Sequence, residues 1–277
     1  MSGIKTIGSS GDYPTLTAAV SAISSQGLSG PIILELLSTY NSSSETFPIN
    51  LSSLPTDATK TITIRPAAGV TSALISGSNT TAIITLSSNY VTIDGRAGGT
   101  GSHKNLTIRN SANAKTIGIN NSQNCSIKYC ILEGAPLSSS QGIVFLDANN
   151  NSILIENSDI KNIDASNKPY NGIYLKENTN NSITISKCKI YNFNSAGINI
   201  YNSGSLTISE KEIYEVEPAT QSFVYGVYIN QTSQCNIFKN KIYNLTTNTT
   251  GSPYIRGIYV SSTSAVSIYN NVISIGP

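Results

Sequence analysis

Charged side chains that recur at regular intervals are the first candidates for chemistry in this sequence. They follow short apolar segments, and alignment of these segments separates them into two stripes: Arg65, Asp94, Lys128 and Glu156 in the first, and Arg109, Glu133 and Lys161 in the second. Neighbouring acids and bases can transfer protons, so one interpretation is a charged catalytic groove. Because opposite charges alternate within each stripe, the other interpretation is a set of surface ion pairs, each worth about 0–1 kcal/mol.

Tyrosines recur at two other positions of the aligned segments. They are Tyr191, Tyr214 and Tyr243 at one position, and Tyr174, Tyr228 and Tyr259 at the other. Aromatic rings at equivalent positions of adjacent strands stabilise the strands by stacking, and this interpretation needs no ligand. An exposed row of rings would also suit sugars, which present apolar faces between their hydroxyl groups. The six tyrosines are therefore the predicted ligand-binding residues.

An internal repeat must position these side chains. Its units open with glycines that are 24 to 31 residues apart: Gly118, Gly142, Gly172, Gly197, Gly226 and Gly257. Within a unit, apolar pairs such as Ile183 and Ile185 are two residues apart, which is the period of a β-strand. Each unit holds three such strands separated by Asn, Ser and Gly, and units of this length stack on one another. We therefore predict an all-β parallel β-helix with three strands in each coil.

The first 60 residues differ from the repeats and predict an N-terminal cap (strand, helix, strand and loop) that is continuous with the solenoid. Four apolar residues share one helical face: Leu16, Ala19, Val20 and Ile23. Pro14 suits the first turn of this helix, and Gly27 suits the position just after its end. Residues 61–277 are predicted to form the coils. Because the pattern stops abruptly near residue 275, we expect a truncated, open last coil that can contact another chain end to end.

Composition disfavours several functional classes. The net charge of +2, with 12% charged residues, provides no strong field that would attract nucleic acid. The sequence lacks a stretch of about 18 apolar residues, the length that would predict membrane insertion. A single histidine leaves little material for a metal or cofactor site. Four cysteines are predicted to be buried thiols rather than disulfides: Cys125, Cys130, Cys188 and Cys235. Three of them, Cys125, Cys188 and Cys235, lie on different repeats. Lys211 falls at the same inward position as Cys188, and because a buried ammonium is costly we expect a bulge or an outward side chain there.

Two segments resemble a known family. Residues 90–110 (YVTIDGRAGGTGSHKNLTIRN), with the later repeats that end in IYN, resemble the right-handed parallel β-helix repeats of the pectin lyase-like superfamily. Residues 8–23 (GSSGDYPTLTAAVSAI) resemble its N-terminal cap helix. The resemblance implies a right-handed solenoid in a bacterial protein that is secreted or at the cell surface and is often directed at carbohydrate. Many members are non-catalytic modules, whereas the lyases use an Arg or Lys base, often with Ca²⁺ held by carboxylates.

These observations leave three hypotheses. The first is a non-catalytic extracellular scaffold of the adhesin type, without metal or cofactor, which binds a polysaccharide, a cell-surface glycan or another surface through the six tyrosines. The second is a polysaccharide lyase that cleaves a uronate polymer by β-elimination at the two charged stripes, with Ca²⁺ as a possible cofactor. The third is a structural solenoid that stacks end to end. Hydrolysis by paired carboxylates is disfavoured, because the sequence has no Asp-Asp pair.

Overall fold

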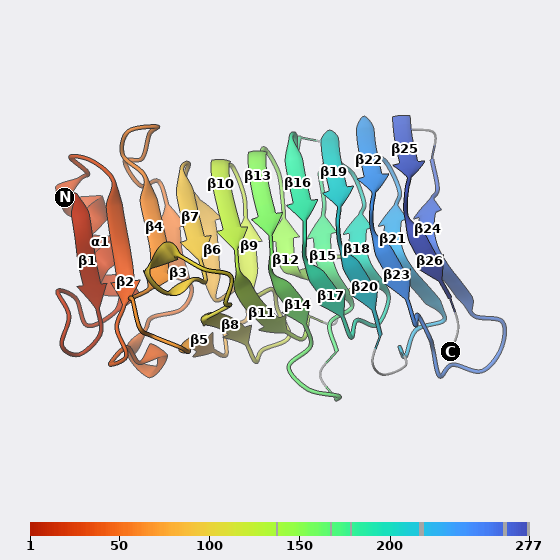
Figure 1. Cartoon of the computed structure of the whole chain (residues 1–277), viewed down its shortest axis with the longest axis horizontal. Helices are drawn as coiled ribbons and strands as arrows, with labels where there is room; N and C mark the ends of the chain where they lie inside the picture. The colour runs from red at the N-terminus through yellow and green to blue at the C-terminus, as the bar shows by residue number, and fades with distance from the viewer. Residues whose placement is uncertain (137, 167, 178, 216–218, 263–264, 276–277) are drawn as a thin grey trace.

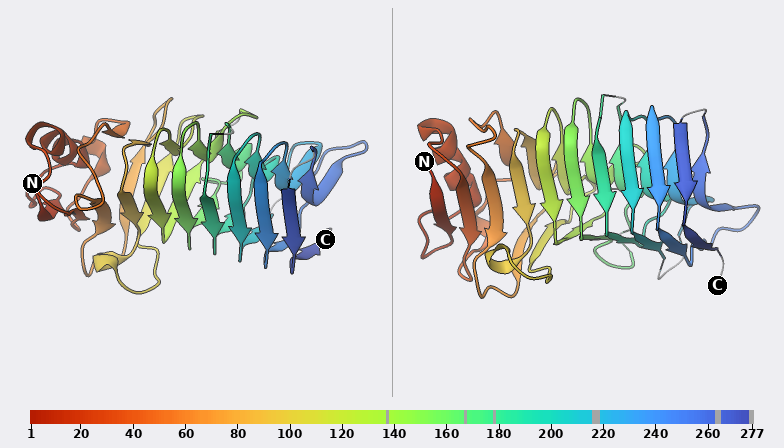
Figure 2. Two further views of the ribbon diagram at one scale, coloured as in Figure 1. Left: turned by 90° about the horizontal axis from the view of Figure 1, so that it is seen from above. Right: turned by 45° about the horizontal axis from the view of Figure 1, so that its top comes forward.

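The computed structural model describes residues 1–136, 138–166, 168–177, 179–215, 219–262 and 265–275. The strands wind into an elongated solenoid, with the N-terminus at one end and the C-terminus at the other (Figures 1 and 2). Successive coils contribute strands to three sheets, and every pair of neighbouring strands in these sheets is parallel. The structure thus has the predicted all-β parallel β-helix architecture, with one short helix near the N-terminus.

Sheet 1 has ten strands, in the order β1-β2-β4-β7-β10-β13-β16-β19-β22-β25. Their bounds are Gly3–Ile7 (β1), Ile32–Leu36 (β2), Ile62–Pro66 (β4), Val91–Asp94 (β7), Gln123–Lys128 (β10), Asn151–Glu156 (β13), Ile183–Ser186 (β16), Ser205–Ser209 (β19), Gln234–Phe238 (β22) and Ala265–Tyr269 (β25). Because β1 and β2 belong to this sheet, the first residues of the chain continue directly into the solenoid.

Sheets 2 and 3 have eight strands each and complete the coils. Sheet 2 consists of Ala73–Gly77 (β5), Leu106–Asn110 (β8), Cys130–Gly134 (β11), Asp159–Lys161 (β14), Lys189–Tyr191 (β17), Glu212–Tyr214 (β20), Lys241–Tyr243 (β23) and Val272–Ser274 (β26). Sheet 3 consists of Ile49–Ser52 (β3), Ile84–Ser87 (β6), Ile117–Ile119 (β9), Gly142–Leu146 (β12), Asn171–Leu175 (β15), Ala196–Ile200 (β18), Phe223–Ile229 (β21) and Tyr254–Val260 (β24). Strand β3 shows that the segment before residue 61 already contributes to the coils.

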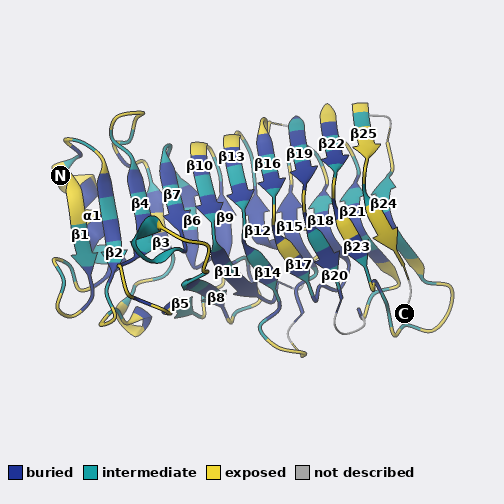
Figure 3. Cartoon of the chain, in the orientation of Figure 1, coloured by how far each residue is buried: buried dark blue, intermediate teal, exposed yellow. Residues whose placement is uncertain are grey.

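Equivalent apolar residues of successive coils fill the interior. Ile155 pairs with Ile185, Ile185 with Ile208, and Ile208 with Ile237 in register, and all four are fully buried. Buried and partly exposed residues alternate along strands such as β4 and β16, whereas β12 and β15 are buried throughout. Buried residues run along the length of the solenoid (Figure 3). The four cysteines are free and buried, so the prediction of buried thiols is confirmed. We call a set of equivalent residues in adjacent coils a column.

The corner between sheets 1 and 2 repeats one backbone geometry. The first corner residue has a left-handed conformation, with φ between 49° and 55°, at Tyr129, Asn157, Lys187, Glu210, Lys239 and Asn270. The next residue turns inward, and its side chain bonds to backbone groups at the same corner. Asn271, for example, accepts a hydrogen bond from Asn240 N (3.0 Å) and donates to the carbonyl oxygens of Ile237 and Tyr269. These contacts satisfy backbone groups that the bend removes from the sheets.

The prediction for Lys211, which occupies this inward corner position, is wrong. The sequence favours a bulge or an outward side chain, but the residue is only 1% exposed and its side chain points into the solenoid. The ammonium nitrogen donates to the carbonyl oxygens of Ile185 and Ser209. These corner carbonyls accept hydrogen bonds from the ammonium group and so reduce the free-energy cost of burying it. Burial nevertheless lowers the pKa of Lys211 from 10.5 to about 7.

Helix α1 (Leu16–Gln26) buries the predicted apolar face near the N-terminal end of the core. Its N-cap is Thr15, whose side chain accepts a hydrogen bond from Ala18 N (3.0 Å), so Pro14 precedes the cap instead of lying in the first turn. Glu45 accepts hydrogen bonds from Leu16 N and Thr17 N. At this N-terminal end, the helix dipole stabilises the negative charge of the carboxylate. Among the described residues, no helix is long and apolar enough to cross a membrane.

Candidate functional site

Residues of the first charged stripe form ion pairs with residues outside the stripe. Arg65 Nη2 binds Glu35 Oε1 at 2.6 Å instead of pairing with Asp94. Asp94 is bound by Arg96 at 2.7 Å and by Lys128 at 3.7 Å. Burial raises the pKa of the Asp94 carboxyl, but its hydrogen bonds to Arg96 and the nearby positive charges outweigh burial and lower the pKa overall. Asp94 is therefore an ionised structural partner of its neighbours.

The second stripe forms one connected group. Glu133 binds Arg109 at 2.6 Å and Lys161 at 3.3 Å, so the structure brings all three residues together. Ca²⁺ takes six to eight oxygen ligands, usually several of them from carboxylates. Two of the three carboxylates of the stripes, Asp94 and Glu133, are already bound by cationic side chains, and Glu156 alone does not supply the several carboxylates of a calcium site. Among the described residues, no group of three or more His, Cys, Asp or Glu side chains is arranged to hold a metal ion.

The first tyrosine column lies on sheet 2. The ring centroids of Tyr191 and Tyr214 are 5.0 Å apart, and those of Tyr214 and Tyr243 are 4.9 Å apart, with interplanar angles of 7° and 11°. Burial raises the pKa of each of these tyrosines to about 12. Because each ring covers the face of the next, this column offers a ligand little flat aromatic surface.

The second aromatic column lies on sheet 3 and contains other residues besides the three predicted tyrosines. The register places Phe145, Tyr174, Asn199, Tyr228 and Tyr259 in consecutive coils. The rings of Phe145 and Tyr174 are nearly parallel with centroids 5.8 Å apart, and those of Tyr228 and Tyr259 are 5.6 Å apart and tilted by 32°. Asn199 interrupts the column between these two pairs.

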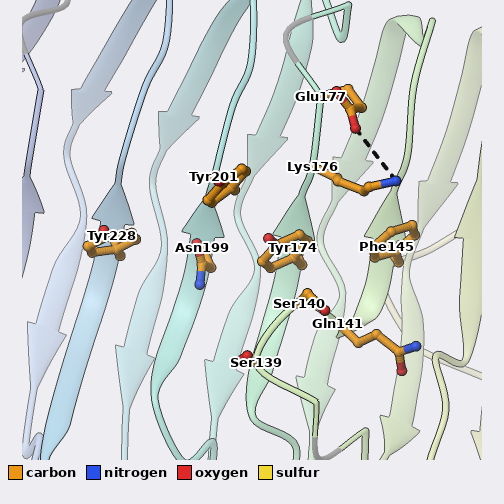
Figure 4. Close-up of a pocket in the computed structure, with 10 residues that line it drawn as sticks. All are labelled: Ser139, Ser140, Gln141, Phe145, Tyr174, Lys176, Glu177, Asn199, Tyr201 and Tyr228. Atoms are coloured by element: carbon orange, nitrogen blue, oxygen red, sulfur yellow. Dashed lines mark ion pairs between the residues drawn. The ribbon is translucent and has the colours of Figure 1, made fainter.

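A hollow of about 660 Å³ lies over the interruption (Figure 4). Its size falls within the roughly 300–1,000 Å³ that small-molecule sites occupy. Aromatic rings come from Phe145, Tyr174, Tyr201 and Tyr228, and polar groups from Ser139, Ser140, Gln141, Lys176, Glu177 and Asn199. A second hollow of about 220 Å³ shares Ser139, Asn199 and Tyr228 and adds Phe223 and Tyr225 among others. We call the two together the sheet 3 groove.

The rings of the groove differ in how much surface they present. Tyr174 is 4% exposed and Phe145 is 7% exposed, so they form the floor. Tyr201 is 55% exposed and Phe223 is 51% exposed, so they stand at the rim. Tyr228 is partly exposed between them. The repeat pattern predicts Tyr174 and Tyr228 as ligand-binding residues, but it does not predict the other aromatic residues of the groove.

The charges around the groove balance one another. Lys176 Nζ binds Asp147 at 3.0 Å and Glu177 at 3.5 Å, and Lys115 Nζ lies 4.6 Å from the centroid of the Phe145 ring. The hydrogen bond and charge of Asp147 raise the pKa of Lys176, and burial raises the pKa of Tyr174 to about 12. Both groups keep their protons near neutral pH. Neither is therefore suited to act as a general base, which needs a pKa near the working pH.

Comparison with known proteins agrees with the architecture. The family model described as "Right handed beta helix region" matches residues 115–276, which is more than half of the chain and includes the whole sheet 3 groove. No curated protein matches this sequence significantly. The match and the three parallel sheets agree, and the chain belongs to the right-handed beta helix family.

Proposed function

We propose that this chain is a non-catalytic module that binds a glycan in the sheet 3 groove, outside the cell or at its surface. The observation that supports the proposal is a hollow lined by aromatic rings and by Asn199 and Gln141, whose buried amide oxygens receive no hydrogen bond from any described residue. Sugars carry apolar C–H faces and hydroxyl donors, so they match both kinds of lining. The extracellular placement rests on the resemblance to secreted β-helix proteins.

The state of the ionisable groups favours binding over bond cleavage. β-Elimination needs a base that gives up its proton near neutral pH, but the pKa of Lys176 is raised. Burial lowers the pKa of Lys115, but its Nζ lies over the Phe145 ring. In the charged stripes, Arg65 and Arg109 are bound to carboxylates. The lyase therefore remains the alternative that an assay must address.

The end-to-end solenoid also remains a prediction. Val272 is 62% exposed and Ile273 is 45% exposed at strand β26, so an apolar surface is present at the last described coil. If this surface mediates association, a charged residue at Val272 would abolish concentration-dependent oligomers in sedimentation experiments. Glycan binding in the sheet 3 groove does not depend on such contacts.

Removal of the partly exposed rings is expected to weaken glycan binding. Tyr201→Ala and Tyr228→Ala should each reduce affinity for the bound polysaccharide roughly tenfold, because each removes an aromatic face that a sugar would cover. Affinity gel electrophoresis against immobilised polysaccharides measures this change directly. Tyr243→Ala is the matched control, since it removes a ring from the stacked column on sheet 2 and should leave affinity unchanged.

The same experiment can overturn the proposal. Equal retention of Tyr201→Ala, Tyr228→Ala and the unmodified protein would place glycan binding outside the sheet 3 groove. A selective loss with Tyr243→Ala would move the binding site to the first tyrosine column on sheet 2. Thermal unfolding of each variant identifies losses of affinity that arise from misfolding.

A further inference from the structure

The orientation of the amide groups below the groove is fixed by a short chain of hydrogen bonds. Asn171 is fully buried, and its Nδ2 donates to the carbonyl oxygens of Ser139 (3.0 Å) and Gln141 (2.7 Å). Carbonyl oxygens only accept hydrogen bonds. The Asn171 side chain must therefore direct its NH₂ group toward the Ser139–Gln141 segment and leave Oδ1 as an acceptor for its other neighbour.

Asn199 is that neighbour, and its orientation follows in turn. Asn199 Nδ2 donates to Asn171 Oδ1 at 3.2 Å, so Asn199 Oδ1 must face away from Asn171. This oxygen is buried, and no described residue donates a hydrogen bond to it. Gln141 Oε1, which belongs to another residue lining the same hollow, is buried and unpartnered in the same way. A buried acceptor without a donor is unfavourable, so a rotation of either side chain that turns its oxygen toward a ligand hydroxyl in the hollow would satisfy that oxygen.

The position of Asn199 in the column explains why a hollow forms there. Adjacent coils are about 4.8 Å apart, so Tyr174 and Tyr228, two coils apart, are separated by about 10 Å with the short Asn199 side chain between them (Figure 4). Gly118 also lacks a ring in this column. There the Lys115 side chain packs beside Gly118 and extends over the Phe145 ring, so it occupies the space that a ring would fill. At Asn199 the two hollows of the groove meet.

The unpartnered groups indicate the chemistry of the occupant. Two acceptor oxygens call for hydroxyl donors. A uronate residue keeps its ring hydroxyls, but in place of the C6 hydroxyl donor it carries an ionised carboxylate, which offers only further acceptors. The two charged residues that line the hollows, Lys176 and Glu177, have opposite signs. We propose that Asn199, assisted by Gln141, determines ligand choice by accepting hydrogen bonds from sugar hydroxyls, so that the groove selects neutral glycans over uronates. This inference rests on the proposed glycan-binding function.

Asn199→Leu tests the assignment, because leucine keeps the approximate shape of asparagine and removes the acceptor. The probes are gluco-, manno-, xylo- and galacto-oligosaccharides and oligogalacturonate, titrated calorimetrically at one salt concentration. We expect the unmodified protein to bind a neutral probe more tightly than oligogalacturonate, and Asn199→Leu to weaken that binding roughly 10- to 100-fold. Asn236→Leu, on the outer face of sheet 1, is the matched control and should bind normally.

A second variant keeps the test decisive if Asn199→Leu folds poorly. Asn199→Tyr would extend the aromatic column through the gap and fill the hollow, so it should fold well and lose binding of every probe. Unchanged affinity of Asn199→Leu for neutral probes, or tighter binding of oligogalacturonate that Tyr228→Ala removes, would overturn this inference and leave glycan binding in the groove intact. Absence of binding to any probe would overturn the proposed function together with the inference.

Discussion

Asparagine in place of Lys211 is expected to raise the free energy of unfolding by about 2–4 kcal/mol at pH 7, since each unit of pKa shift corresponds to about 1.4 kcal/mol. Burial holds the pKa of this lysine at about 7 in the folded chain, against a value of 10.5 without burial. The neighbouring coils show that asparagine suits the position. Asn271 donates to Ile237 O and Tyr269 O, the equivalents of the two carbonyls that Lys211 contacts.

The pH dependence of the Lys211→Asn effect has a definite sign. Between pH 7 and about 10.5 the unfolded chain carries a proton on Lys211 that the folded chain lacks, so this lysine makes stability rise as pH rises. The cost of burying the lysine is fully present below pH 7 and disappears above pH 10.5. The advantage of Lys211→Asn should therefore shrink steadily as pH rises from 7 to 10.

Urea denaturation of both proteins across this pH range measures the effect. Burial raises the pKa of the Cys188 and Cys235 thiols, and the charge of Lys211 lowers it. Both proteins are therefore compared in a Cys188→Ser, Cys235→Val background, so that the difference in stability isolates the lysine. Ser186→Asn, on an outward position of strand β16, controls for a surface asparagine and should change stability by less than about 0.5 kcal/mol. A Lys211→Asn protein that is less stable than the parent at pH 7 would contradict the account of this corner.

Alanine in place of Gly95 is expected to destabilise the solenoid by more than about 4 kcal/mol, the range reached when a substitution forces a severe backbone clash. A Cβ atom at this position would overlap the carbonyl oxygen of Tyr129 in the next coil and lie 3.1 Å from Cys130 N. The neighbouring backbone atoms can move only if the hydrogen bond from Gly95 N to Lys128 O (2.8 Å) is lost. The close spacing of adjacent coils is the cause of this effect.

Gly30→Ala is the matched control for Gly95→Ala. Its added Cβ would meet no atom nearer than Ser2 Cβ at 3.4 Å, so stability should change by less than about 0.5 kcal/mol. Soluble yield and equilibrium denaturation of the two variants can be compared directly. If Gly95→Ala were as stable as Gly30→Ala, the described packing of the coil at Tyr129 on Gly95 would be wrong.

The coils could be predicted from the sequence because the direction of a side chain along a strand is a local property. Ile183 and Ile185, two residues apart, necessarily point the same way, and both are buried. The contacts of Lys211 could not be predicted in this way. The alignment places it inward, whereas the cost of its charge favours an outward position. The carbonyls that decide between the two are backbone groups, and the pattern of side chains does not show where they point.

Part of the sheet 3 groove could also have been found from the sequence. Asn199 follows Gly197 by two residues, as Tyr174 follows Gly172 and Tyr228 follows Gly226, so the alignment already places the asparagine in the aromatic column. The tyrosines by themselves indicate a row of rings, and the interruption at Asn199 is evident only from the residue at the same position of every repeat. The segment Ser139–Gln141 has no periodic pattern, and its position against the column depends on buried contacts to Asn171 that only the structure shows.

The proposal that this is a binding module without catalytic activity can be tested in one measurement. Neutral and uronate polysaccharides are incubated with the protein and Ca²⁺, and the chain length of each polymer and the retention of the protein are recorded in the same run. We predict retention by a neutral polysaccharide without shortening of any polymer, and no change with Lys128→Ala. Shortening of a uronate polymer that Lys128→Ala abolishes would contradict the account and assign lyase activity to the first charged stripe.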